Sequence, residues 1–255
     1  MSRSAWNIFG WGVHALFALT VVALFQFLRG PSDAPQFEVR RDAALFDGLL
    51  ALQFSISHSV LLLPGVRRRL VSWIPGPMYG VGFCFATCLS LLLTIQLWQP
   101  IGGVLWCLTG PARLAMQCAF YGAWVALFYS LRLSGLGYQT GWTTWRPWAQ
   151  GKPAPRREFR PVGVYRWFRH PVYFSFLGLI WLTPVMTFDR AVLTAVWTLY
   201  IFIGSHLKDR RLTHYLGDEY RSYQAQVPGY PGVAFGPLGR IPWRVQPKPA
   251  VAPTR

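Results

Sequence analysis

Residues 79–98 read YGVGFCFATCLSLLLTIQLW, and this stretch decides the fold class. No charged side chain occurs in it. A helix of about 20 apolar residues is about 30 Å long, which matches the hydrocarbon core of a bilayer. Backbone N–H and C=O groups in hydrocarbon must bond to one another, and a single segment can satisfy them only as a helix. The stretch therefore predicts a membrane-spanning helix.

Apolar runs of similar length lie on both sides of this stretch. They cover residues 7–28, 43–63, 111–131, 171–187 and 191–207. Phe188-Asp189-Arg190 separates the last two, which predicts a helical hairpin whose second arm continues to about Leu216. Gly217 ends that arm, and a short cytoplasmic helix follows. The sequence thus predicts an all-α fold, a multi-pass transmembrane helical bundle of about five to six spans.

Composition excludes several other classes of protein. Of the residues, 53% are hydrophobic and only 13% charged, whereas a soluble domain has about 25% charged residues. The net charge of +16 comes from basic residues between the apolar runs, which indicates membrane loops rather than a nucleic-acid surface. The four cysteines form no Cys-x-x-Cys pair, and His206 and His214, eight residues apart, have no cysteine near them. We expect neither a disulfide framework nor a metal site.

The chain divides into four predicted segments. Residues 1–131 hold four spans, and residues 132–169 form a basic connector outside the hydrocarbon, with its tryptophans at the headgroup level. Residues 170–231 form the helical hairpin and a cofactor region, and residues 232–255 form a disordered tail. With six spans, all arginine-rich loops fall on one side, so the positive-inside rule places both termini in the cytoplasm.

Charged and aromatic side chains gather where the hairpin leaves the membrane. Its two arms are equal in length. The first runs 17 residues from His170 to Thr187 and the second runs 17 residues from Ala191 to Lys208, which is about 25 Å for each as a helix. We expect Arg169 and His170 to lie level with Lys208 and Asp209. Such a group suits S-adenosylmethionine, whose carboxylate matches arginine and whose sulfonium matches a carboxylate and aromatic faces. The alternative is that the basic residues are headgroup anchors.

Two blocks of sequence carry a resemblance. Arg169-His170-Pro171-x-Tyr173 is followed about 35 residues later by a charged pair, Leu212, Gly217, Tyr220, Tyr223 and Val227-Pro228. Together they resemble the carboxy-terminal signature of the isoprenylcysteine carboxyl methyltransferase and phospholipid methyltransferase superfamily, over residues 163–231. Members are multi-pass membrane enzymes that bind S-adenosylmethionine at this end. The resemblance implies that cofactor and these binding residues: Tyr165, Arg169, His170, Tyr173, Asp209, Tyr220 and Tyr223.

A second resemblance covers most of the chain. Gln53-Phe-Ser-Ile-Ser-His58-Ser59-Val60, Arg67-Arg68-Arg69 and Leu182-Thr183-Pro184-Val185-Met186-Thr187 are similar to the bacterial methanethiol S-methyltransferase group. It implies methylation of a small thiol to a sulfide. His58, a polar residue in an apolar span, is then the catalytic candidate, and a structural histidine bonded to another helix is the alternative. The chain departs from the superfamily at Lys208-Asp209, where two glutamates are usual.

Three classes of function are compatible with these patterns. The first is an integral-membrane, S-adenosylmethionine-dependent methyltransferase that acts on a small apolar thiol, with a lipid amine or a prenylated cysteine as alternative substrates. The second is a non-catalytic accessory membrane protein on the same scaffold. The third is a membrane reductase that uses NADPH, because sterol-type reductases share a similar carboxy-terminal block. The predicted partners are the small thiol or lipid-like substrate and the bilayer, without nucleic acid. The sequence does not set the oligomeric state.

Overall fold

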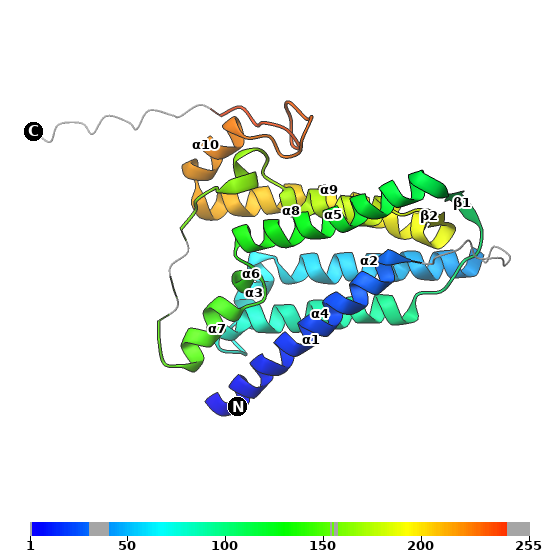
Figure 1. The fold of residues 1–255 in the computed structure, drawn as a ribbon. Coiled ribbons are helices and arrows are strands. Elements are labelled where there is room, and N and C mark those ends of the chain that lie inside the picture. The colour runs from blue at the N-terminus through cyan, green and yellow to red at the C-terminus, as the bar shows by residue number, and fades with distance from the viewer. Residues whose placement is uncertain (1, 31–40, 154, 156–157, 244–255) are drawn as a thin grey trace, which may run out of the picture. The chain divides into compact units, whose positions relative to one another are not determined.

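The computed structural model describes residues 2–30, 41–153, 155 and 158–243 (Figure 1). Within these residues, five helices are long and apolar enough to cross a membrane: α1, α2, α4, α5 and α9. The α-helices are α1 (Arg3–Arg29), α2 (Arg41–Leu61), α3 (Pro64–Leu70), α4 (Tyr79–Leu97), α5 (Gly110–Ser134), α6 (Leu136–Gln139), α7 (Trp142–Ala149), α8 (Pro171–Trp181), α9 (Phe188–Leu216) and α10 (Asp218–Gln226). This confirms the prediction of an all-α, multi-pass bundle. The chain is an integral membrane protein.

Contacts divide the chain into two compact units. The helical unit comprises Met1–Glu158 and Val172–Ile201, and the carboxy-terminal unit comprises Phe159–Pro171 and Phe202–Arg255. The unit boundaries follow Glu158, Pro171 and Ile201, whereas the predicted segments end at residues 131, 169 and 231. The helix α9 contributes its first part to one unit and its last part to the other.

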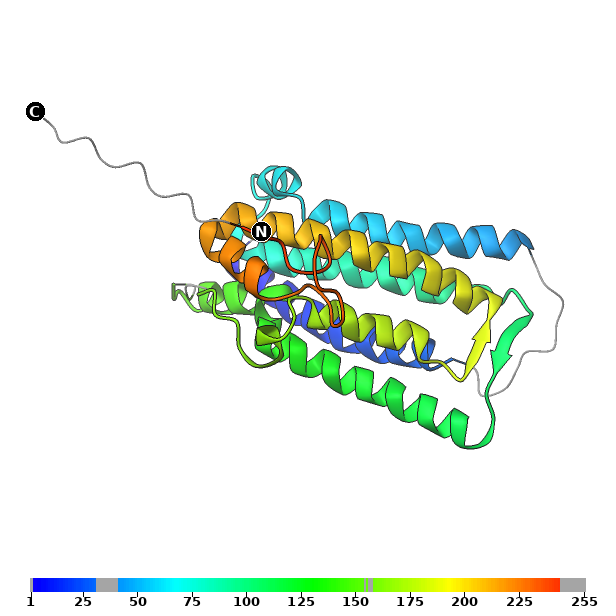
Figure 2. The same ribbon diagram turned by 90° about the horizontal axis from the view of Figure 1, so that it is seen from above.

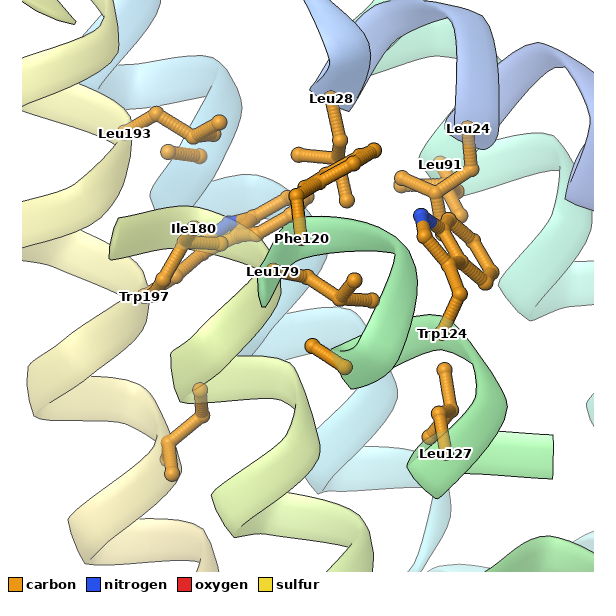
Figure 3. Close-up of a cluster of buried hydrophobic side chains, with 13 residues drawn as sticks. Leu24, Leu28, Leu91, Phe120, Trp124, Leu127, Leu179, Ile180, Leu193 and Trp197 are labelled. Atoms are coloured by element: carbon orange, nitrogen blue, oxygen red, sulfur yellow. The ribbon is translucent and has the colours of Figure 1, made fainter. Parts of the chain in front are cut away.

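The core of the helical unit draws on α1, α2, α4, α5, α8 and α9 (Figure 3). Leu24 of α1, Trp124 of α5 and Trp197 of α9 are among its buried members. Lipid tails are as apolar as these side chains, so withdrawal from water contributes little to helix association inside a bilayer. Close packing of the aromatic and aliphatic side chains must therefore hold the helices together.

A second cluster fixes α7 against α1 and α4. Trp145 of α7 is fully buried beside Val13, Val81 and Cys84, so this tryptophan packs against other helices. Gly10 of α1 makes room for it, since a Cβ atom built at Gly10 would overlap the indole ring of Trp145. The composition of this segment predicts one location for all of its tryptophans and cannot identify the one that packs inward.

The hairpin differs from the prediction in its first arm. Residues 171–187 were expected to form one helix, but α8 ends at Trp181. Pro184 explains the early end, because proline lacks an N–H group and disfavours helical geometry at the preceding residue. The chain continues as strand β2 (Val185–Thr187), which pairs antiparallel with β1 (Val104–Cys107) at one end of the helical unit (Figure 2). The sequence did not predict these strands.

The end of the chain is more ordered than expected. As predicted, α9 ends at Leu216, Gly217 turns the chain with a φ of +59°, and α10 ends before Pro228. The predicted disordered tail begins at residue 232, but Tyr230 N donates to Leu238 O (3.0 Å) and Arg240 N donates to Ala234 O (2.9 Å), which folds this stretch into a turn. Because the bonded residues are not neighbours in the sequence, local composition does not predict this turn. Residues 244–255, the rest of the predicted tail, lie outside the described residues.

The contact between α1 and α7 leads to a prediction. We expect Gly10→Ala to lower the free energy of unfolding by about 1–3 kcal/mol, because Trp145 must move. Gly12→Ala, in the same helix, meets nothing within 4 Å and should be neutral or stabilising. Thermal unfolding in detergent compares the two variants. Equal midpoints would contradict the close packing.

Candidate functional site

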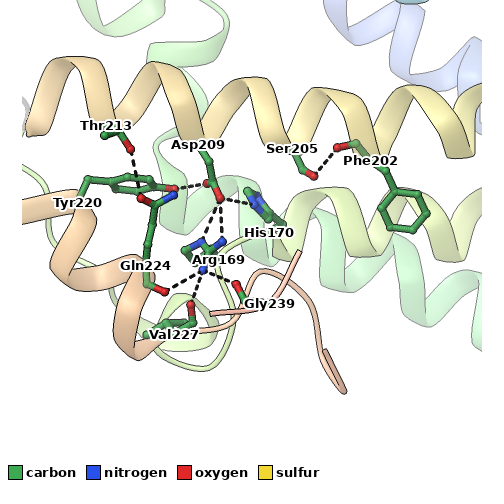
Figure 4. Close-up of polar contacts among 10 residues, drawn as sticks. All are labelled: Arg169, His170, Phe202, Ser205, Asp209, Thr213, Tyr220, Gln224, Val227 and Gly239. Carbon is green, nitrogen blue, oxygen red and sulfur yellow. Dashed lines mark hydrogen bonds and ion pairs between the residues drawn. The ribbon is translucent and has the colours of Figure 1, made fainter. Parts of the chain in front are cut away.

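A buried ion pair forms the centre of the carboxy-terminal unit (Figure 4). Arg169, just before α8, donates from Nη2 and Nε to the same carboxylate oxygen of Asp209 in α9, at 2.8 and 3.2 Å. The side chains are 0% and 3% exposed. A buried charge is costly unless it is paired and hydrogen-bonded, so these two residues require one another.

Three backbone carbonyls complete the shell around the guanidinium. Arg169 Nη1 donates to the carbonyl oxygens of Val227 (2.5 Å), Gly239 (2.9 Å) and Gln224 (3.3 Å). The backbone of the same segment is fixed as well, because Arg169 N donates to Pro228 O and His170 N to Gly229 O. One side chain thus ties the start of α8 to the end of α10 and to the turn that follows.

The Asp209 carboxylate has two further neighbours. The Tyr220 hydroxyl in α10 donates to its other oxygen at 2.5 Å, and His170 Nε2 lies 3.3 Å from the oxygen that Arg169 binds. Burial raises the pKa of Tyr220, and the adjacent carboxylate raises it further, so this phenol keeps its proton and acts as a donor. Burial lowers the pKa of His170 although Asp209 opposes the shift, which favours the neutral imidazole.

Aromatic side chains line the flank of this cluster. Phe159 makes edge-to-face contacts with Tyr220 and Tyr223, whose ring centroids lie 5.5 and 5.4 Å away. The Tyr223 hydroxyl donates to Tyr165 O (2.5 Å), and Lys208 Nζ lies 6.0 Å from the Tyr165 ring centroid. Aromatic faces attract cations, so this flank combines rings with a basic side chain.

His58 lies in the helical unit and has its own polar partner. Its Nδ1 is 2.6 Å from the hydroxyl of Tyr200 in α9, and the ring of Phe54 lies beside both. On the same helix, Ser57 bonds to Ser90 of α4 at 2.8 Å. The polar residues His58 and Ser57 of this span thus contact α9 and α4.

The structure brings most of the predicted cofactor residues together. Tyr165, Arg169, His170, Asp209, Tyr220 and Tyr223 all belong to the carboxy-terminal unit, and the predicted level of Arg169 with Asp209 is confirmed. Tyr173 belongs to the helical unit, where it packs against the main hydrophobic cluster. Their assignment to cofactor binding stays a prediction.

Sequence analysis missed two residues that complete these groups. Gln224 lies one helical turn after Tyr220, on the same face of α10, and its side chain accepts a hydrogen bond from Thr213 (3.2 Å). The four-residue spacing could have revealed it. Tyr200 lies in an apolar run, and no local pattern in the sequence connects it with His58.

Comparison with known proteins places the chain among its relatives. It is 32% identical over 190 residues to a methanethiol S-methyltransferase of a Pseudomonas species, a match that covers 72% of each chain. The chain belongs to the methanethiol S-methyltransferase family. A family member from Crocosphaera subtropica is 28% identical over 242 residues, 89% of this chain and 92% of the relative. Nurim from Xenopus laevis is 27% identical over 169 residues, 63% of this chain and 59% of Nurim. No family model and no solved structure matches.

The buried ion pair of this family member yields a second prediction. We expect Asp209→Asn to lower the free energy of unfolding by about 3 kcal/mol, because it leaves the Arg169 charge buried without its counter-ion. Asp218→Asn is the matched control in the same unit. Asp218 pairs with Arg221 at 2.9 Å, but both side chains are exposed and such pairs contribute little.

Thermal unfolding in detergent, followed by circular dichroism, distinguishes the two variants. The midpoint of Asp209→Asn should fall clearly below that of Asp218→Asn. Similar midpoints would mean that the ion pair does not hold the unit together.

Proposed function

We propose that this chain is a membrane methyltransferase that transfers a methyl group from S-adenosylmethionine to a small thiol such as methanethiol. The observation that carries the proposal is the likeness, over most of the chain, to proteins named methanethiol S-methyltransferase. The apolar helices support a membrane location. The bacterial cytoplasmic membrane and cytoplasmic termini remain part of this proposal.

The residues of the carboxy-terminal unit fit the donor in their chemistry. S-adenosylmethionine carries a carboxylate, a positive sulfonium and an adenine ring. The Lys208 ammonium suits the carboxylate, and the rings of Tyr165 and Tyr223 suit the sulfonium and the adenine. When bound, this donor supplies a methyl group that the sulfonium already activates.

Arg169 and Asp209 take a different role in this proposal. The guanidinium already donates to one carboxylate and three carbonyl oxygens, and the carboxylate already accepts from Arg169 and Tyr220. We therefore assign Arg169, His170, Asp209 and Tyr220 to positioning the backbone and rings of the donor site. Tyr165, Tyr223 and Lys208 are the residues that we expect to contact the donor.

His58 is proposed to act on the thiol. Its Nδ1 can donate a proton to the Tyr200 hydroxyl oxygen, a bond that fixes the tautomer in which Nε2 carries a lone pair. That lone pair can accept the thiol proton, which leaves a thiolate, the reactive form of sulfur. The aromatic neighbours Phe54 and Phe83 limit the access of water to this histidine.

A second candidate is an accessory protein without catalysis. It is favoured by the mutual saturation of Arg169 and Asp209, together with the Lys208-Asp209 sequence that replaces the usual pair of glutamates. Under this alternative the ion pair serves only the fold, and the donor does not bind.

The first test is an assay for methyl transfer. We expect the purified protein in detergent to convert methanethiol and methyl-labelled S-adenosylmethionine into labelled dimethyl sulfide, and to bind the labelled donor at equilibrium. Donor binding without sulfide would overturn the thiol as acceptor while keeping the methyltransferase class. No donor binding by the folded protein would favour the accessory alternative.

The second test concerns His58. We expect His58→Gln to lower the rate of sulfide formation about 100-fold near neutral pH, the scale of a lost general base. The loss should shrink as the pH rises, because the thiol then ionises without help. His206→Gln, an exposed histidine of α9, is the control and should keep the parent rate. A loss that is constant across pH would contradict the role as base.

A further inference from the structure

A recess in the helical unit shares no residue with the proposed donor and thiol sites. It is formed where α1 ends, where α5 begins and where the chain leaves α8, and its empty volume is about 400 Å³ with the adjoining open solvent included. Its lining includes Arg29 of α1, Arg113, Gln117 and Tyr121 of α5, and Leu182 and Pro184 after α8. The early end of α8 supplies the last two, because a helix that continued past Trp181 would not place an extended segment here.

The polar part of this recess has the chemistry of an anion site. Two guanidinium groups, a carboxamide and a phenol line it, and none of its lining residues in the described chain is acidic. Guanidinium groups are well suited to phosphate, because their N–H groups match pairs of phosphate oxygens. The last carbonyls of α1 do not require Arg29, since Arg190 donates to Phe27 O (2.7 Å) and Leu28 O (2.9 Å).

The apolar part continues along the outside of α5. Leu114, Tyr121, Val125 and Phe128 are exposed, and their spacing of seven, four and three residues places them on one face of the helix. Tyr121 belongs both to this face and to the recess. From Leu114 to Phe128 the face is about 21 Å long, somewhat more than half of the hydrocarbon thickness.

A basic recess that opens onto an apolar helix face matches a molecule with a phosphate at one end and acyl chains at the other. We propose that the recess binds the phosphate of an anionic phospholipid, such as phosphatidylglycerol, and that its acyl chains lie along the Leu114–Phe128 face of α5. Inorganic phosphate shares the headgroup chemistry but has nothing to place on that face.

Native mass spectrometry can test this site. The full-length protein is reconstituted with equal amounts of phosphatidylglycerol and phosphatidylcholine, extracted, and scored for the ratio of the two lipids that it retains. We expect Arg29→Gln with Arg113→Gln to lower this ratio at least about tenfold, the scale of one lost charge-assisted hydrogen bond. Arg132→Gln is the control, since it removes one positive charge from α5 about 28 Å from Arg113 and should leave the ratio unchanged.

Two further measurements test the acyl chains and the phosphate group separately. Val125→Asp, which keeps both arginines, should also lower lipid retention, and an unchanged retention would overturn the acyl contact. Excess inorganic phosphate should displace little phosphatidylglycerol from the parent, and full displacement would reduce the recess to a phosphate site.

The measured lipid preference can be separated from misfolding of a variant and from methyl transfer. Arg29→Lys with Arg113→Lys retains both charges, so it should keep most of the preference for phosphatidylglycerol even if the glutamine variant misfolds. Equal losses in the lysine variant, the glutamine variant and Arg132→Gln would overturn the proposal. Since the readout is retained lipid, the outcome does not depend on whether the protein methylates a thiol.

Discussion

The need to neutralise one buried guanidinium organises the carboxy-terminal unit. Arg169 has no access to solvent, so every donor that it directs inward must find an acceptor within the chain. The acceptors come from α9, from α10 and from the turn near Gly239, which are separated by up to 70 residues from Arg169. Because a buried charge without its partner is far more costly than a missing apolar contact, this group has few alternative arrangements. The aromatic flank around Tyr165 and Tyr223 depends on the same framework.

This arrangement changes how the charges at the end of the hairpin are interpreted. From the sequence, Arg169 and Asp209 were expected to bind the two ends of S-adenosylmethionine, but in the structure they satisfy one another. In the proposed function, their effect on a bound donor is indirect, through the backbone and rings that they hold. Lys208, which replaces an expected acidic residue, lies beside an aromatic ring and brings a positive charge to the flank. Under the proposed function, Lys208 would attract the carboxylate of the donor, so the departure from two glutamates is compatible with donor recognition.

The sequence predicted most of the architecture because the bilayer simplifies the problem. Apolar runs of about 20 residues have one stable form in hydrocarbon, so α1, α2, α4, α5 and α9 followed from length alone. Counting residues along the hairpin also placed Arg169 beside Asp209. Features that depend on distant partners did not follow. The pairing of β1 with β2, the burial of Trp145 and the turn after Tyr230 each require a contact that no local pattern encodes. Pro184 was visible as a helix breaker, but its effect was overlooked within a strongly apolar run.

The shell of carbonyl oxygens around Arg169 has a consequence for how this protein can vary over evolution. Every residue carries the same carbonyl, so Val227 serves the guanidinium through a group that any amino acid would supply. Selection at such a position acts on the path of the main chain and hardly at all on the side chain. Two homologues could therefore share this shell of carbonyl oxygens and have different amino acids at position 227. A comparison of their sequences would show only Arg169 and Asp209 as shared residues.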